Sequence, residues 1–323
     1  MFRCVSFFAG VGGIDLGFAQ TGKFKTIYAN EFDPFPVKTF ELNNKDVKVD
    51  CRSIIDVSSF DIPDADILFA GFPCTDISVA GERKGLFEDD GSFTRSGLFF
   101  EVIRILEQKR IPIVFFENVK NLVNHDGGKT FDIILSSLSS LGYHCKYAVL
   151  NAMTYGNVPQ NRERIYIVGF LDESFYNDFS FPSPIPLTTS LRDIIDFDSK
   201  VDDKYYYVPG KYKEGMYEKL CEAMDDENAI YQWRRKYVRK NKSGVVPTLT
   251  ANQGEGGHNV CLIKSKYGIR KMTPHECFNA QGFPFDFILP SDVSDSRLYK
   301  QAGNSVCVSV IKRIADKLLE VID

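Results

Sequence analysis

Residues 66–78 read DILFAGFPCTDIS and place a short apolar run directly before a loop that carries a thiol. The run Asp66–Ala70 has the length and composition of a buried strand, and Gly71 and Pro73 then end it. Cys74 is therefore expected on the loop that leaves the carboxyl end of this strand. In open α/β sheets that end faces the ligand crevice, so the thiol is either a nucleophile or a small buried filler. The rest of the chain decides between the two.

Apolar runs alternate with longer amphipathic stretches through the first half of the chain. The pattern predicts strands over 3–8, 26–30, 66–70, 112–116, 144–151 and 165–170, and helices over 13–21, 34–43, 97–109 and 127–141. Such alternation is typical of a doubly wound, mostly parallel α/β sheet. It fades after residue 170 into acidic loops, prolines and a tyrosine run, which predicts a smaller, loop-rich second domain over 171–262. A final helix over 306–321 is expected to return to the first domain, so that 1–170 and 263–323 form one unit.

The composition narrows the class of protein. The chain has 323 residues, of which 44% are apolar and 25% charged, as in an ordinary globular protein. It has no apolar run of about 18 residues and no secretory signal, so we expect no membrane association. Its eight cysteines are scattered without a Cys-x-x-Cys pair, and the four histidines do not cluster near them, so we expect no metal site. Scattered thiols predict a cytoplasmic protein.

Charge is divided unevenly along the chain, although the net charge is only −4. Residues 171–228 hold 6 Lys/Arg against 14 Asp/Glu, whereas residues 229–272 hold 10 Lys/Arg against one Glu. The centre of the basic segment, QWRRKYVRKNK over 232–242, mixes aromatic with basic side chains. Phosphate binding depends on a local field rather than on the average charge, so this segment is a candidate nucleic-acid contact. The alternative is a solvated basic face.

A second informative stretch is VSFFAGVGGIDLGF over 5–18, a strand that runs into a glycine-rich turn and then a helix. It is either a nucleotide loop or a tight turn, and it departs from Gly-x-Gly-x-x-Gly because the third glycine falls at Gly17. The next strand ends at Glu31, where a carboxylate is placed to accept hydrogen bonds from ribose hydroxyls. Phe32 beside it offers a flat face to an adenine ring. Together these residues predict an adenosine-containing cofactor.

Two further segments carry candidate site residues. Glu117 follows the apolar run 113–116, and it faces the same pocket as Cys74 if the two strands are neighbours; otherwise it caps a helix or lies on the surface. Arg162 and Arg164 alternate around Glu163, so both side chains point the same way on an extended segment. Two guanidiniums on one face suit phosphate or carbonyl recognition, and the alternative is a rung of surface ion pairs.

Taken in order, these segments resemble the C5-cytosine DNA methyltransferase family of bacterial restriction–modification systems. The matching stretches are FAGVGG (8–13), NE (30–31), GFPC (71–74), ENV (117–119), QNRER (160–164), RKMTPHEC (270–277), QGFP (281–284) and QAGNSV (301–306). Only about 171–262 lies outside them, and in the family that gap is the target recognition domain. The charge distribution is an independent reason to place DNA contacts there.

The resemblance implies a Rossmann-like domain that binds S-adenosylmethionine and a smaller DNA-reading domain. The residues then expected to bind the cofactor are Phe8, Gly10, Gly12, Gly13, Glu31, Phe32, Ser53, Ile54, Pro73, Leu98, Asn304 and Val306. One segment departs from the family, which usually has Gly-Asp-Ile where this chain has CRSI over 51–54. Either Ser53 or, after a shift, Asp50 takes the adenine contact.

The resemblance also implies a reaction at a cytosine that has been extruded from the double helix. Cys74 adds to carbon 6 and makes carbon 5 nucleophilic toward the methyl donor. Glu117 offers a proton at N3, which requires its pKa to be raised by burial, and Arg164 binds the carbonyl O2. Arg162 is expected beside the same base. The base that removes the C5 proton cannot be named from the sequence.

The expected partner is double-stranded DNA. The predicted DNA contacts are Arg83, Arg234, Arg235, Arg239, Lys240 and Thr250, and residues 81–92 are predicted to form a mobile lid. We expect a monomer that works beside a cognate restriction endonuclease without a stable complex. Two rivals are a same-fold enzyme acting on tRNA, and a DNA-binding regulator without catalysis, in which Cys74 or Glu117 would be replaced.

Overall fold

The computed structural model spans residues 1–323 and describes all of them except 74–96, 213, 235 and 254–258. The chain divides into two compact units. Unit 1 consists of Met1–Leu150, Glu163–Ser183 and Val310–Asp323, and unit 2 of Asn151–Arg162 and Pro184–Ser309.

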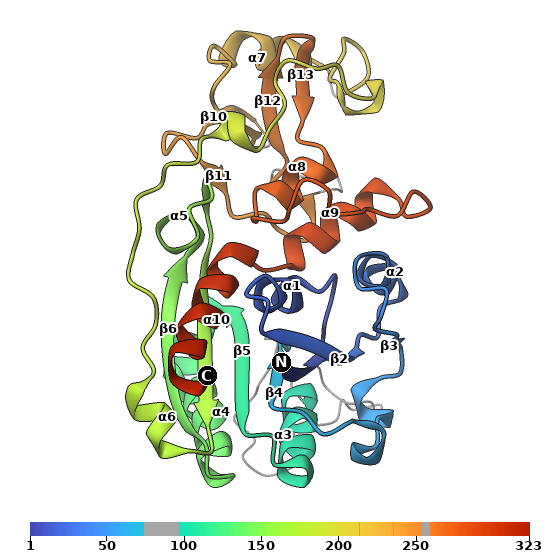
Figure 1. The fold of residues 1–323 in the computed structure, drawn as a ribbon. Coiled ribbons are helices and arrows are strands. Elements are labelled where there is room, and N and C mark those ends of the chain that lie inside the picture. Colours follow the sequence, from blue (N-terminus) through green and yellow to red (C-terminus); the bar gives the residue numbers. More distant parts are fainter. Residues whose placement is uncertain (74–96, 213, 235, 254–258) are drawn as a thin grey trace. The chain divides into compact units, whose positions relative to one another are not determined.

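Unit 1 is built on a seven-stranded sheet with the order β3-β2-β1-β4-β5-β8-β6 (Figure 1). Its strands are β1 (Phe2–Phe7), β2 (Phe24–Asn30), β3 (Val49–Asp50), β4 (Ile67–Ala70), β5 (Ile113–Val119), β6 (His144–Asn151) and β8 (Glu163–Phe170). The helices are α1 (Gly13–Ala19), α2 (Pro34–Asn43), α3 (Gly97–Lys109), α4 (Lys129–Ser140), α6 (Glu173–Asp178) and α10 (Val308–Ile322), with short 3-10 turns η1 (Ile54–Asp56), η2 (Ser59–Asp61) and η4 (Lys120–Gly128). Strands β3, β2, β1, β4 and β5 pair in parallel, and β8 joins β5 antiparallel.

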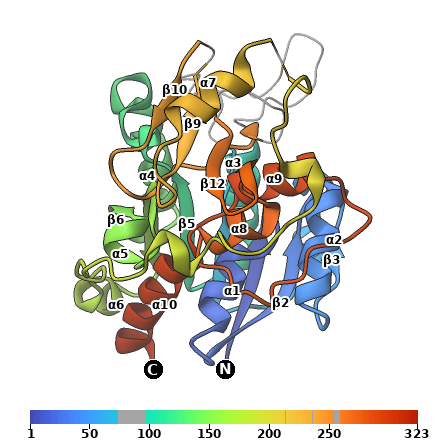
Figure 2. The same ribbon diagram turned by 90° about the horizontal axis from the view of Figure 1, so that it is seen from above.

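Helices cover both faces of this sheet, because successive side chains of a buried strand point to opposite sides. On one face, Phe18 of α1 lies 4.3 Å from Phe69 and 5.1 Å from Phe115, measured between ring centroids. On the other face, Leu68 and its neighbours form the main core with residues of α3 and α4. Figure 2 shows α3 and α1 on opposite sides of the strands. The predicted doubly wound, mostly parallel α/β sheet is confirmed.

Most predicted strands and helices of unit 1 are present, and the differences have local causes. The sequence analysis did not anticipate β3, which is only two residues long. Strand β5 extends past 116 because its pairing with β8 continues to Val119 opposite Arg164. Helix α4 begins at Lys129 rather than 127, since Gly127 and Gly128 have φ of +65° and +95° and cannot be helical there.

Unit 2 combines a four-stranded sheet of order β10-β9-β12-β13 with a two-stranded parallel pair, β11-β7. Its strands are β7 (Gln160–Asn161), β9 (Tyr231–Trp233), β10 (Val238–Lys240), β11 (Val246–Pro247), β12 (Cys261–Ser265) and β13 (Gly268–Lys271). Its helices are α5 (Ala152–Tyr155), α7 (Met216–Ala223), α8 (Pro274–Asn279) and α9 (Asp295–Asn304), with turns η5 (Leu191–Asp193) and η6 (Asp203–Tyr205). Helix α7 packs on one face of the larger sheet through Leu220, Tyr231 and Leu262.

The compact units do not follow the expected boundaries at 170 and 263. Residues 171–183 lie in unit 1, whereas 151–162 and 263–309 lie in unit 2. Buried hydrogen bonds explain why residues 151–162 belong to unit 2. The Gln160 side-chain amide donates to the Ala280 carbonyl at 2.7 Å, and Arg162 donates to the Leu249 carbonyl at 3.0 Å. Residues Val310–Asp323 return to unit 1, where Lys23 Nζ lies 2.6 Å from an Asp323 carboxylate oxygen. Which residues form the DNA-recognition domain stays a prediction.

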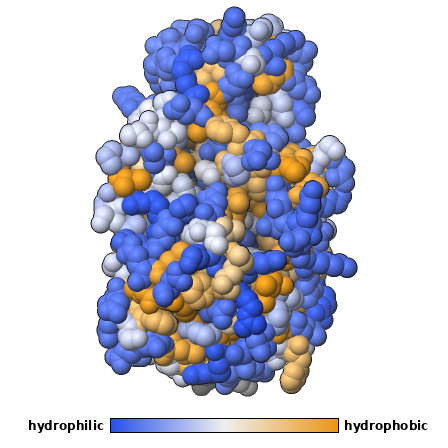
Figure 3. Space-filling model, in the orientation of Figure 1, coloured by the Kyte–Doolittle hydropathy of each residue, from blue (hydrophilic) through white to orange (hydrophobic). Residues whose placement is uncertain are grey.

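The surface is of the ordinary kind for a folded protein. Hydrophilic residues cover most of the face seen in Figure 3, and apolar residues gather there in several separate groups. Among the helices of the described ranges, none has the length and apolar content that a bilayer crossing requires.

A buried carboxyl supports the turn between β1 and α1. Asp15, 2% exposed, accepts hydrogen bonds from the hydroxyls of Ser6 at 3.0 Å and Thr26 at 2.7 Å. Burial raises the pKa of Asp15 above its ordinary value, and the two hydroxyl donors oppose that rise. The folded state therefore binds a proton that the unfolded chain releases once the pH exceeds about 4.

We expect Asp15→Asn to gain stability relative to the wild type as the pH rises from about 4 to 7. The raised pKa of Asp15 contributes stability that is present below its unfolded value and is lost at higher pH, and asparagine has no proton to lose. Asp15→Ala leaves two buried hydroxyls without an acceptor and should cost about 2–4 kcal/mol at either pH. Urea unfolding at both pH values measures these changes. If the free energies of unfolding of Asp15→Asn and the wild type differed by the same amount at both pH values, the raised pKa of Asp15 would be contradicted.

Candidate active site

The glycine-rich loop after β1 is held in a conformation that only glycine adopts without strain. Gly10 and Gly12 have φ of +56° and +81°, and a Cβ at Gly12 would lie 2.8 Å from the Phe40 ring. The loop ends at Gly13, where α1 begins with its first backbone N–H groups directed toward the loop. The nearest described atoms lie more than 4 Å from where a Cβ of Gly10 would stand, so backbone is accessible here.

Glu31 lies at the carboxyl end of β2, the strand beside β1, and ties this loop to the next turn. Its carboxylate accepts hydrogen bonds from the backbone N–H groups of Gly10 and Asp33, both at 2.9 Å. Burial raises the pKa of Glu31, and these two backbone donors act in the opposite direction. A carboxylate has about four lone-pair positions, so two remain for ribose hydroxyls. Phe32, next in the chain, is 70% exposed.

The alternatives left open at β3 have different environments. Asp50 accepts hydrogen bonds from the Tyr28 hydroxyl at 2.9 Å and from Arg52 Nη2 at 2.6 Å. The hydrogen bonds from Arg52 lower the pKa of Asp50 to about 2. Ser53 precedes η1 and its side chain caps no backbone N–H there. Asp50 is thus occupied by protein partners, which favours Ser53 for the adenine contact.

The remaining predicted cofactor residues divide between the units. Phe8, Pro73 and Leu98 are partly exposed in unit 1, and Ile54 is buried there with 2% exposure. Asn304 and Val306 belong to unit 2. The structure thus describes each of these side chains without testing whether it contacts a cofactor.

Glu117 lies at the end of β5, directly beside the loop that leads to Cys74. Strands β4 and β5 are parallel neighbours with Ala70 opposite Phe116, so the next residues, Gly71 and Glu117, are also adjacent. A Cβ at Gly71 would lie 3.9 Å from Glu117 Oε2. The Asn118 amide donates to the Phe72 carbonyl at 2.9 Å and anchors the loop two residues before Cys74. The condition set by the sequence, that the two strands be neighbours, is met.

Arg164 reaches Glu117 from the antiparallel neighbour β8. Its Nε lies 3.2 Å from Glu117 Oε1, and the two side chains are 13% and 11% exposed. Arg164 Nη1 also donates to the Glu163 carbonyl at 2.8 Å, which restrains the guanidinium. A carboxyl and a guanidinium are therefore held together at the edge of the sheet where the Cys74 loop begins.

Arg162 has a different environment although it is only two residues earlier. It belongs to unit 2, is 2% exposed, and donates to the carbonyl oxygens of Leu249 and Gly303 at 3.0 Å each and to that of Ser305. Gly303 is required at this point, because a Cβ there would lie 2.3 Å from the Thr250 carbonyl carbon. The geometry makes Arg162 a positioning residue that joins the chain near Thr250 to the chain near Asn304.

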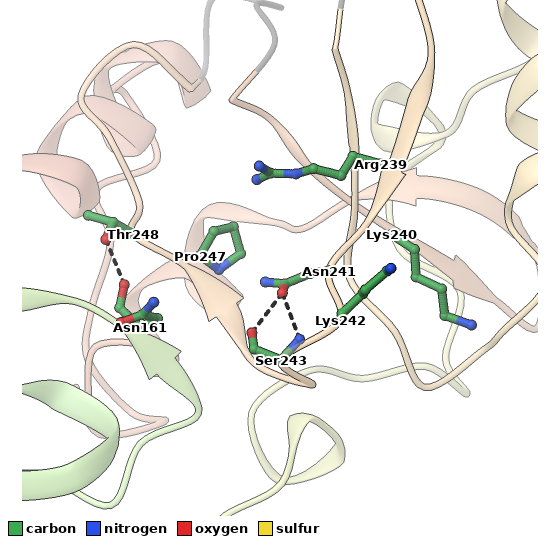
Figure 4. Close-up of a pocket in the computed structure, with 8 residues that line it drawn as sticks. All are labelled: Asn161, Arg239, Lys240, Asn241, Lys242, Ser243, Pro247 and Thr248. Atoms are coloured by element: carbon green, nitrogen blue, oxygen red, sulfur yellow. Dashed lines mark hydrogen bonds between the residues drawn. The ribbon is translucent and has the colours of Figure 1, made fainter.

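The predicted DNA contacts that the structure describes lie in unit 2. Arg239 and Lys240 line a pocket of about 470 Å³ that is shown in Figure 4, together with residues that were not predicted, Thr248 among them. Arg234 lies at the turn that joins β9 to β10, where its backbone N–H donates to the Tyr237 carbonyl at 2.8 Å. Thr250 Oγ1 donates to the side chain of Asn252 at 2.8 Å. The predicted positions are thus distributed over one sheet edge and the β11 segment. Cys74, Arg83, Arg235 and the predicted lid over 81–92 lie outside the described residues.

Sequence reasoning missed several buried polar residues that hold segments of unit 2 together. Gln160, fully buried, holds Ala280, and Arg270 forms a buried ion pair with Glu276 at 2.7 Å. Arg270 also donates to the Asp196 carbonyl at 2.6 Å. The motif RKMTPHEC contains both members of this ion pair. A basic and an acidic residue six positions apart, on either side of a helix start, were therefore the sequence signal that could have predicted it.

The fold and the site define a class of protein before any relative is considered. A mostly parallel sheet with helices on both faces carries a glycine loop after β1, a carboxylate at the end of β2 and reactive groups after β4 and β5. This is the arrangement of a Rossmann-like nucleotide-binding enzyme, in which ligands bind at the carboxyl ends of the strands.

Comparison with known proteins identifies the family. Residues 2–320 match the C-5 cytosine-specific DNA methylase family, to which the chain belongs. Type II methyltransferase M.Bsp6I of Bacillus sp. (strain RFL6) is 55% identical over 98% of both chains. Type II methyltransferase M1.ScrFI of Lactococcus lactis subsp. cremoris is 40% identical over 100% of this chain and 79% of its own. The DNA (cytosine-5-)-methyltransferase class predicted from the sequence is confirmed.

Solved structures agree on the fold. The Dnmt2 methyltransferase of S. pombe superposes with a TM-score of 0.75 over 99% of both chains at 17% identity. The Entamoeba histolytica methyltransferase EhMeth gives a TM-score of 0.73 over 100% of this chain and 99% of that one, at 16% identity.

We expect Arg162→Ala to destabilise the protein by about 3–5 kcal/mol, because three buried carbonyl groups lose their donor at once. Arg192→Ala is the matched control: its ion pair with Asp198 is exposed at 48% and 77%, so about 0.5–1 kcal/mol is expected. Denaturant unfolding of the full chain measures both. Equal effects of the two substitutions would show that Arg162 does not hold these segments together.

Proposed function

We propose that the chain transfers a methyl group from S-adenosylmethionine to carbon 5 of a cytosine in double-stranded DNA. The observation that carries the proposal is the pairing of Glu117 with Arg164 beside the loop that leads to Cys74. An acid, a hydrogen-bond donor fork and a thiol are the groups that activation of a cytosine ring requires.

The residues at the ends of β1 and β2 suit an adenosyl group. Gly10 and Gly12 leave the backbone accessible, Glu31 keeps acceptor capacity for ribose hydroxyls, and exposed Phe32 offers a face to the adenine. Ser53 is the proposed adenine contact at β3, since Asp50 is engaged by Tyr28 and Arg52. When bound, S-adenosylmethionine supplies an electrophilic methyl group. The other proposed contacts are Gly13, Ile54, Pro73, Leu98, Phe8, Asn304 and Val306.

Cytosine must be activated before its carbon 5 can accept a methyl group. In the proposed reaction the thiolate of Cys74 forms a bond to carbon 6, and the electron pair of the C5–C6 double bond becomes available at carbon 5. After methylation, loss of the C5 proton restores that double bond and expels the thiolate. These steps need an unstacked base, so the target cytosine leaves the double helix.

Glu117 and Arg164 have complementary roles in this proposal. Negative charge moves toward N3 and O2 as the thiolate adds. Arg164 donates hydrogen bonds to O2, and Glu117, in its protonated form, donates a proton at N3. The anchored end of β5 and the Glu163 carbonyl keep both groups in position before the base arrives. Arg162 acts through the main-chain segments that it holds rather than on the base itself.

The proposed biological setting is supported by the relatives that carry Type II methyltransferase names. We propose that this enzyme protects the sites of a cognate restriction endonuclease in a bacterium, working at the nucleoid as a monomer without a stable complex with that nuclease. Unit 2 supplies the proposed sequence-reading contacts through its basic segment.

A duplex oligonucleotide with 5-fluorocytosine at the target position tests the covalent step. Fluorine at carbon 5 cannot leave as a proton does, so the wild type with S-adenosylmethionine should form a denaturation-resistant adduct through Cys74. Cys74→Ser should form none, whereas Cys221→Ser, which alters an exposed thiol on α7, should form it fully. Glu117→Gln should slow adduct formation about 10²-fold while DNA affinity is kept. Gel mobility and peptide mass spectrometry report the result, and an adduct in Cys74→Ser would exclude the mechanism.

Bisulfite sequencing of DNA from cells that express the chain identifies the substrate and the site. We expect methylcytosine at one short DNA sequence. Methyl transfer from labelled donor to tRNA but not to DNA would instead favour the RNA-modifying alternative, and no transfer to either would favour a regulator without catalysis.

A further inference from the structure

The basic segment of unit 2 occupies an edge strand, β10, whose residues alternate between the two faces of the sheet. Arg239 stands opposite Gln232 on β9, and Gln232 stands opposite Cys261 on β12. Lys240 stands opposite Tyr231, which belongs to the core that α7 covers. Two neighbouring cations of the same segment are therefore presented on opposite faces, as Figure 4 shows.

The charge of Lys240 is offset within the protein. Its Nζ lies 3.1 Å from an Asp225 oxygen and 3.0 Å from an Asp226 oxygen, at the end of α7. Hydrogen bonds to Asp226 and Asp225 raise the pKa of Lys240 above its ordinary value. Pairing with two carboxylates reduces the attraction of this lysine for phosphate and links β10 to the chain that follows α7. A DNA contact at Lys240 stays a prediction.

Arg239 is oriented by a neutral group instead. Its Nη2 donates to Gln232 Oε1, and Gln232, only 4% exposed, is itself fixed because its Nε2 donates to the Asn259 carbonyl at 3.2 Å. The amide directs the guanidinium without cancelling its charge. In Figure 4 this guanidinium extends on the side of Pro247 and Thr248, away from the side chain of Lys240.

We propose that Arg239 is a specificity-determining residue that reads a guanine in the major groove of the target site, an inference that rests on the proposed function. A phosphate is bound either by a point charge such as that of lysine or by a guanidinium, whereas the O6 and N7 acceptors of guanine lie in one plane and are matched best by a planar pair of N–H donors whose direction is fixed. A guanidinium held by a buried amide on an exposed edge strand meets that second requirement. The pocket is also lined by the cations Lys240 and Lys242, and by the neutral donors and acceptors Asn161, Asn241, Ser243 and Thr248, which suit neighbouring base edges or sugars.

The test compares the full-length wild type with Arg239→Lys, Arg239→Ala and Lys219→Ala. The wild-type methylation pattern first supplies the target site. Arg239→Lys keeps the charge but loses the fork, so kcat/KM at that site should fall about 10–100-fold and sequencing should show relaxed preference at one guanine. Arg239→Ala should in addition reduce the slope of log affinity against log salt by about 1. Lys219 lies exposed on α7, and Lys219→Ala should stay within about twofold of the wild type.

Guanine analogues locate the contact. Each guanine of the site is replaced in turn by 7-deazaguanine, which lacks the N7 acceptor. One position should reduce wild-type kcat/KM about tenfold and leave Arg239→Ala unaffected, since the lost bond is the same in both cases.

The outcomes separate the two proposals. A wild type that methylates no DNA would overturn the proposed function. A wild type that methylates its site while Arg239→Lys keeps wild-type kcat/KM and site preference would overturn the guanine contact and assign Arg239 to phosphate. Insensitivity of the wild type to 7-deazaguanine at every position would overturn it as well.

Discussion

The parallel pairing of β1, β2, β4 and β5 is the constraint on which the site in unit 1 depends. Parallel strands end at the same edge of a sheet, so the glycine loop, Glu31, residues 71–73 and Glu117 meet there although they are far apart in the chain. The antiparallel strand β8 then adds Arg164 to that edge. The sequence alone leaves more than one role open for each of these groups. Their position at one edge of the sheet brings them close enough to act on the same ligand.

Unit 2 is held together by a different kind of interaction, because much of it is irregular chain with few ladder hydrogen bonds. Buried polar side chains take the place of regular structure: Arg162 and Gln160 satisfy carbonyl groups of distant segments, and Arg270 joins Glu276 to the chain at Asp196. A buried arginine has five donors in a fixed plane, so it can hold several strands of chain at once. That property explains how Arg162 binds three backbone carbonyl groups, while Arg164, two residues later, pairs with Glu117.

Local pairing also decides what the basic segment does. A count of charges treats Arg239 and Lys240 alike, yet two aspartates that follow α7 form ion pairs with Lys240, and a glutamine orients Arg239. The strand alternation separates them, and the neighbouring elements then give each its own electrostatic environment. Charge counts along the chain thus located the segment without ranking its members.

The sequence by itself determined the sheet class, most strand and helix positions, and the ordered motifs that define the methylase family, because apolar periodicity and short motifs are local properties. It could not determine β3, whose two residues show no periodicity, nor the unit boundaries, which depend on hydrogen bonds between residues about 90–140 positions apart. Only the tertiary structure decided that Glu117 lies beside Gly71, that Arg162 is buried among carbonyl groups, and that Lys240 pairs with Asp225 and Asp226. The physical reason is that burial and electrostatic pairing depend on which elements pack together, and the sequence of a single segment does not determine which elements pack against it.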